Sequence, residues 1–153
     1  MIYLKDDINL IKGKKVIYSC AGGAYRSTLF IRFENRCAIW ARRYWEISKC
    51  GILIACSEDD ATADIGIMAV AARMLIGSVM DAILLDDNTF QLGMLFENGY
   101  SLWLYPEKEQ REDFKPLDNW EYDIPFKGFG YVITSQLETV TRILVNSPKN
   151  RET

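Results

Sequence analysis

The chain has 153 residues, of which 49% are apolar, 18 are basic and 21 are acidic, and it contains no histidine. This length and composition fit one globular domain and exclude a disordered or low-complexity chain. No apolar run reaches the roughly 18 residues that a membrane helix requires. Histidine is the commonest general base and the commonest metal ligand, and C-x-x-C pairs are absent, so we expect no metal and no other cofactor.

The first residues carry acidic side chains and no long apolar segment of the kind found in secretory signals. We therefore expect a cytoplasmic protein. The four cysteines, Cys20, Cys37, Cys50 and Cys56, lie in apolar or strand-like runs. We expect them to be reduced thiols and not a disulfide framework.

In chain order, the sequence predicts first a short helix that Asp6 or Asp7 caps and Gly13 ends. A longer helix is expected to begin at the capping sequence 57–60 and to end at Gly77, because apolar residues then recur at steps of three and four. Alternation of apolar and polar residues predicts strands at 15–20, 29–33, 37–40, 79–85, 90–96, 100–105 and 131–134.

The C-terminal part is expected to form a closing helix at about 135–146. Ser135 and Glu138 have the spacing of a capping box, and Leu137, Val140 and Leu144 follow at helical spacing. Residues 147–153 are polar, which predicts a flexible tail.

Two parts of the chain repeat. The motif Phe-Glu-Asn followed by Trp occupies 33–40 and recurs 63 residues later at 96–103. A Trp-Glu pair at 45–46 recurs 75 residues later at 120–121. The second copy therefore carries 12 additional residues, which we place in the polar stretch 106–113.

The two units span about 5–50 and about 66–125. Each one is predicted to be an antiparallel β-meander, which is too small to be stable without a covering surface. We therefore expect one α+β domain over residues 1–153, made of two duplicated meanders related by a pseudo-two-fold axis, with helices packed on one face of the sheet.

The repeated residues are expected to be structural. Tryptophans that recur in register are typical of a core, and the repeated glutamates stand beside Asn at hairpin turns, where exposed polar residues are ordinary. The chain has no G-x-S-x-G motif, no histidine to activate Ser or Cys, and no phosphate-binding glycine loop. We therefore expect a protein that is not an enzyme.

Charge is distributed unevenly along the chain. Residues 1–76 have a net charge of +3, whereas residues 77–153 have a net charge of −6. An acidic surface repels nucleic acid and anionic membranes and attracts a basic protein, although it also serves as a solvated face that keeps a protein soluble. The candidate partner-binding residues are Asp86, Asp87, Glu107, Glu109, Glu112 and Asp113, followed by Glu58, Asp59 and Asp60.

Residues 75–122 contain a helix end with Gly, a strand, a Leu-rich strand ending in Phe-Glu-Asn-Gly, a return strand, a polar loop and Asn-Trp-Glu. This pattern resembles small bacterial immunity proteins of polymorphic-toxin and contact-dependent growth inhibition systems. The resemblance implies a cytoplasmic, non-enzymatic protein that binds one cognate toxin domain, often a basic nuclease, and blocks its active surface. It identifies no toxin-contacting residue.

Two alternatives remain open at this point. One is a small-ligand-binding or structural domain that uses a cavity between the duplicated sheets, lined by aromatic residues. The other is an enzyme, with Glu34, Glu97 and Cys50 as the residues to replace in a test. The sequence does not indicate an oligomeric state.

Overall fold

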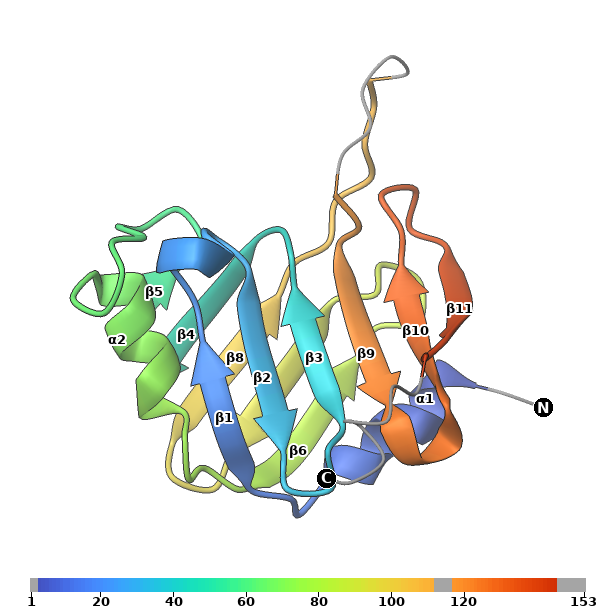
Figure 1. The fold of residues 1–153 in the computed structure, drawn as a ribbon, viewed down its shortest axis with the longest axis horizontal. Helices are drawn as coiled ribbons and strands as arrows, with labels where there is room; N and C mark the ends of the chain where they lie inside the picture. The colour runs from blue at the N-terminus through green and yellow to red at the C-terminus, as the bar shows by residue number, and fades with distance from the viewer. Residues whose placement is uncertain (1–2, 112–116, 146–153) are drawn as a thin grey trace.

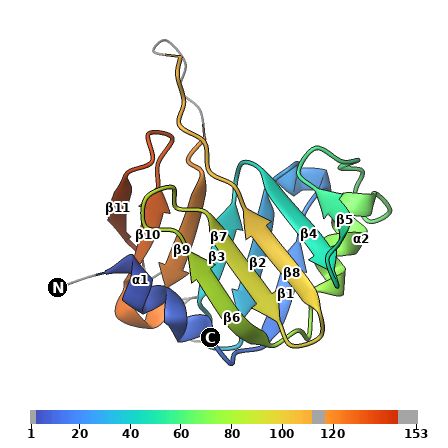
Figure 2. The same ribbon diagram turned by 180° about the vertical axis from the view of Figure 1, so that it is seen from behind.

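The computed structural model describes residues 3–111 and 117–145 and contains two antiparallel sheets that face each other (Figures 1 and 2). The six-stranded sheet contains, in spatial order, β1 (Val16–Cys20), β2 (Leu29–Phe33), β3 (Ala38–Ala41), β9 (Trp120–Ile124), β10 (Phe129–Ile133) and β11 (Thr139–Ile143). The five-stranded sheet contains β5 (Ile52–Cys56), β4 (Trp45–Lys49), β8 (Tyr100–Leu104), β7 (Leu92–Phe96) and β6 (Met80–Leu85).

Helices lie at the two open sides between the sheets. Helix α2 (Ile67–Met74) contacts β1 and β5, while α1 (Leu4–Asp7) and the 3-10 turn η1 (Ile8–Ile11) lie on the other side, where η1 contacts β6 (Figure 1). Two further 3-10 turns are η2 (Gly23–Tyr25) and η3 (Pro125–Lys127). The α+β class is confirmed. The expectation that helices cover one face of the sheet is wrong, because the apolar face of each sheet is buried against the other sheet.

The predicted closing helix at 135–146 is wrong over its described part. Residues 139–143 form strand β11, which pairs with β10. Thr134 Oγ1 accepts hydrogen bonds from the backbone N–H groups of Gln136 and Glu138, so the expected capping box instead forms the turn of a β-hairpin. The β-branched residues of β11 favour a strand. The predicted tail, 147–153, lies outside the described residues.

The longer helix begins later than the sequence predicts. Its first residue is Ile67, and Gly66 occupies the cap position. The acidic residues of 57–60 close a loop instead: Asp59 accepts a hydrogen bond from the N–H of Cys56 at 2.7 Å, and Asp60 accepts one from the N–H of Thr62 at 3.0 Å. Local bonds of this kind compete with helix formation.

The core contains residues of both sheets and includes two of the four tryptophans. Trp45 is 0% exposed and Trp120 is 1% exposed. Their indole N–H groups donate to the carbonyl oxygens of Ser27, at 2.7 Å, and Phe90, at 3.0 Å. The other pair, Trp40 and Trp103, is only half-buried, and lies on the outer faces. A core position for this second pair is therefore wrong, since neighbouring strand residues point to opposite faces.

Matched positions of the repeat make matched contacts. In the six-stranded sheet Ala41 is opposite Trp120, and in the five-stranded sheet Leu104 is opposite Trp45. The N–H of Arg42 bonds to the carbonyl of Asn119, and the N–H of Tyr105 bonds to the carbonyl of Tyr44, both at 3.0 Å. In each pair the positions differ by the same 63 and 75 residues as the sequence motifs.

Asp7 links the N-terminal helical segment to the six-stranded sheet. Its carboxylate accepts hydrogen bonds from Lys127 Nζ at 2.8 Å and from the Tyr131 hydroxyl at 2.5 Å, and its carbonyl accepts one from the Tyr122 hydroxyl at 2.8 Å. Burial raises the pKa of Asp7, but the hydrogen bonds and the charge of Lys127 outweigh burial and hold that pKa below its ordinary value.

Replacing Asp7 with Asn should lower the free energy of unfolding by about 1–3 kcal/mol at neutral pH, the usual contribution of hydrogen bonds to a buried charge. Because the pKa of Asp7 is lowered by folding, this stabilisation is present above the unfolded pKa and is lost as the pH falls through the folded pKa. Urea unfolding at neutral pH and below pH 3.8, the ordinary Asp pKa, measures the difference. A difference that stays constant with pH would contradict this role of the charge.

Candidate functional site

Six connections meet at one end of the two sheets, because neighbouring strands run in opposite directions (Figure 1). We call this end the loop end; its connections are β1–β2 (21–28), β3–β4 (42–44), β5–α2 (57–66), β6–β7 (86–91), β8–β9 (105–119) and β10–β11 (134–138). It contains Asp86, Asp87, Glu107, Glu109, Glu58, Asp59 and Asp60. The remaining two candidates, Glu112 and Asp113, lie outside the described residues.

The loop end is acidic and the opposite end is basic. Among the described residues, the acidic side chains of the loop end are Glu58, Asp59, Asp60, Asp64, Asp86, Asp87, Glu107, Glu109, Asp118 and Glu138. Its basic side chains are Arg26, Arg42, Arg43, Lys108 and Arg111. The connections at the opposite end carry Lys12, Lys14, Lys15, Arg36 and Lys127 against Glu34 and Glu97. Charge is therefore separated along the strand direction, and the division follows the two ends of the fold.

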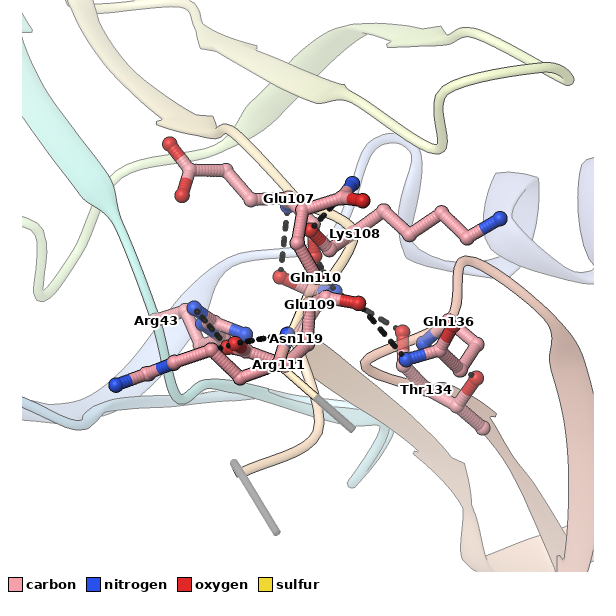
Figure 3. Close-up of polar contacts among 9 residues, drawn as sticks. All are labelled: Arg43, Glu107, Lys108, Glu109, Gln110, Arg111, Asn119, Thr134 and Gln136. Carbon is pink, nitrogen blue, oxygen red and sulfur yellow. Dashed lines mark hydrogen bonds and ion pairs between the residues drawn. The ribbon is translucent and has the colours of Figure 1, made fainter. Parts of the chain in front are cut away.

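The β8–β9 connection is held at its base by Asn119 (Figure 3). The side-chain oxygen of Asn119 accepts a hydrogen bond from the N–H of Glu107 at 3.0 Å. Its amide group donates to the carbonyls of Glu107 and Thr134, each at 3.0 Å. Asn119 is only 3% exposed, so its full set of bonds fixes the connection to the start of β9.

Glu109 holds the next part of the connection. Its carboxylate lies 2.7 Å from Arg111 Nε and 3.8 Å from Arg43 Nη2, and its side chain is 7% exposed. Its main chain bonds to Ser135 and to the Gln136 side chain, on the other side of the connection (Figure 3). The hydrogen bonds from Arg111 lower the pKa of Glu109. This carboxylate is engaged within the protein, so Glu109 orders the loop end and does not offer a free charge.

The other candidates differ in how far their charges are engaged. Asp86 accepts hydrogen bonds from the N–H groups of Asn88 and Thr89, at 2.8 and 2.9 Å, which lower its pKa. Asp59 and Asp60 make similar local bonds. The remaining three exposed carboxylates accept no hydrogen bond and form no ion pair with a described residue: Glu58, Asp87 and Glu107.

A pocket of about 220 Å³ opens at the loop end, lined by Ser27, Arg43, Tyr44, Ser57, Glu58, Tyr105 and Glu107. It brings together two of the predicted residues, Glu58 and Glu107. The rings of Tyr44 and Tyr105 are 5.8 Å apart, and the Tyr44 hydroxyl donates to Glu46 at 2.9 Å. The sequence gave no signal for Arg43, Tyr44 or Tyr105, since these positions belong to no motif.

A second pocket, of about 330 Å³, lies between β1 and α2. Its lining includes Cys20, whose hydrogen bonds with the Tyr18 and Tyr25 hydroxyls raise the pKa of Tyr18 to about 12. It also includes Ser19, which is 2% exposed and whose Oγ has no hydrogen-bond partner among described residues. Both pockets lie outside the interface between the sheets, where the alternative interpretation expected a cavity.

The described ranges contain no cluster of three acidic or thiol side chains placed to hold a metal ion. No helix within those ranges is long and apolar enough to cross a membrane. All four cysteines are unpaired.

Replacing Glu109 with Gln keeps the size of the side chain and removes its charge from Arg43 and Arg111. We expect amide hydrogen exchange of residues 107–111 to become several-fold faster while the melting temperature changes little, because ion pairs near the surface contribute only about 0–1 kcal/mol to stability. Glu138→Gln, which removes an exposed charge from the same end, is the control. Equal exchange in the two variants would contradict the ordering role of Glu109.

Comparison of the chain with models of known protein families, with curated proteins and with solved structures finds no match.

Proposed function

We propose that this is a binding protein without chemistry of its own, which recognises a basic protein through the loop end. The observation that carries the proposal is the gathering of acidic side chains from the β5–α2, β6–β7 and β8–β9 connections at that end. Complementary charge steers association and suppresses unsuitable partners. The free carboxylates of Glu58, Asp87 and Glu107 supply the contacts, and Glu109 keeps the β8–β9 connection in place.

We propose further that the partner is a cognate toxin domain and that binding blocks its active surface, as in a cytoplasmic immunity protein. Two observations support this reading: the resemblance of residues 75–122 to such proteins, and an acidic end suited to a basic nuclease. The same charge disfavours nucleic acid and anionic membrane as ligands.

We also propose that the fold arose by duplication and keeps a pseudo-two-fold axis. The matched register of Ala41 with Trp120 and of Leu104 with Trp45 supports this origin. So does the positive φ of Arg36 and Gly99, which are 63 residues apart at equivalent hairpin turns. The additional residues of the second copy then account for the long β8–β9 connection.

A second candidate function is small-ligand binding in the pocket between β1 and α2. The unpartnered, buried Oγ of Ser19 favours it, because buried polar groups usually have partners. A ligand bound there would raise the melting temperature with its concentration, which a thermal-shift screen of metabolites detects.

The first proposal is tested by affinity capture from the native host followed by binding kinetics. The triple variant Glu58→Lys, Asp87→Lys, Glu107→Lys should weaken binding at least 100-fold, since like charges across an interface cost several kcal/mol. Association of the unchanged protein should slow markedly between low and high salt, because salt screens steering.

The matched control changes the net charge equally but away from the loop end: Asp6→Lys, Asp81→Lys, Glu97→Lys. We expect the control to bind within a few-fold of the unchanged protein. Capture of no basic protein, or equal weakening by both triple variants, would overturn the proposal.

A further inference from the structure

The pocket at the loop end is built on a rigid base. The indole N–H of Trp45 donates to the carbonyl of Ser27 at 2.7 Å, and the N–H of Trp45 donates to Ser57 Oγ at 3.2 Å. Trp45 is fully buried, so these two lining residues are fixed to the core. A pocket formed in this way is organised before any ligand arrives, which lowers the entropic cost of binding.

The walls of this pocket suit a planar cation. Tyr44 and Tyr105 present aromatic rings, and Tyr105 stacks in turn on Trp103 with an angle of 19° between the ring planes. A guanidinium group stacks on aromatic faces and is weakly hydrated, which an ammonium group is not.

The charges of the pocket also favour a cation. Glu58 and Glu107 line it and have no ion pair within 3–111 or 117–145. In Figure 3 the Glu107 carboxylate extends away from the contacts that hold the β8–β9 connection. Arg43 is the one lining cation, and the buried carboxylate of Glu109 offsets its charge. Two uncompensated negative charges therefore remain.

Arg43 contributes a second, independent feature. Its Nη1 atom is buried and has no hydrogen-bond partner among the residues that the structure describes. A buried donor without an acceptor is costly, and a ligand oxygen would satisfy it. The pocket thus combines acceptors for a cation with a donor for a carbonyl oxygen.

We infer that this pocket receives an arginine side chain of the partner protein, with the guanidinium group between Glu58 and Glu107 and against the tyrosine rings, and with a main-chain carbonyl of the same segment accepting from Arg43. This inference rests on the proposed function for the statement that the arginine belongs to a protein. It goes further by separating one specific contact from the general acidity of the loop end.

The probe for the test is N-acetyl-L-arginine amide, followed by backbone amide NMR on the full chain. We expect saturable shifts at residues 57–58 and 105–107. N-acetyl-L-citrulline amide has the same shape without the charge, and it should give none. The variant Glu58→Gln, Glu107→Gln should bind the arginine probe at least tenfold more weakly. The control Asp60→Asn, Asp87→Asn removes equal charge from the same end outside the pocket and should retain binding.

Equal shifts with the citrulline probe, or equal loss of binding in both double variants, would overturn the inference, because the pocket would then read shape alone or the end would act only by its total charge. The proposed function fails separately. If the arginine probe binds as expected but no basic protein is captured, the inference stands and the proposed function falls. If a basic partner is captured and Glu58→Gln, Glu107→Gln leaves its affinity unchanged, the reverse holds.

Discussion

Burial of Trp45 and Trp120 between the two sheets is the constraint on which the rest of the structure depends. Each indole begins a strand, β4 or β9, fills the core and donates its N–H to a loop carbonyl, Ser27 or Phe90. The β1–β2 and β6–β7 loops are therefore attached directly to the core. Because a buried indole requires a partner for its N–H, packing of the core and placement of the loop end are one event.

This attachment explains how a small domain presents a defined surface on loops. Loops carry function when a rigid scaffold positions them, and here the scaffold also provides internal ion pairs. Glu109 uses its charge on Arg43 and Arg111, which orders the β8–β9 connection. Glu58 and Glu107 keep theirs for a ligand. The division between structural and available carboxylates gives the acidic end a shape as well as a charge.

Much of the fold was predictable from the sequence, because period-two alternation and the repeated motifs mark the strands of both meanders. The closing helix was not: Val140 and Leu144 have helical spacing, but β-branched residues and an edge of the sheet at β10 favour strand β11. The capping sequence at 57–60 fails for a similar reason, since its side chains bond within a loop. For the site, composition located the acidic connections, but only contacts distinguish Glu109 from Glu107, and no pattern indicates Tyr44 or Tyr105.

The central claim is that the loop end is the surface that binds a basic protein. Hydrogen–deuterium exchange of the complex with the captured partner tests it most directly, because it maps the contact without any substitution. The account predicts added protection at residues 57–66, 86–91 and 105–111, with no change at 12–15 or 125–128 at the opposite end. Protection confined to the basic end, or to the outer face of either sheet, would contradict it.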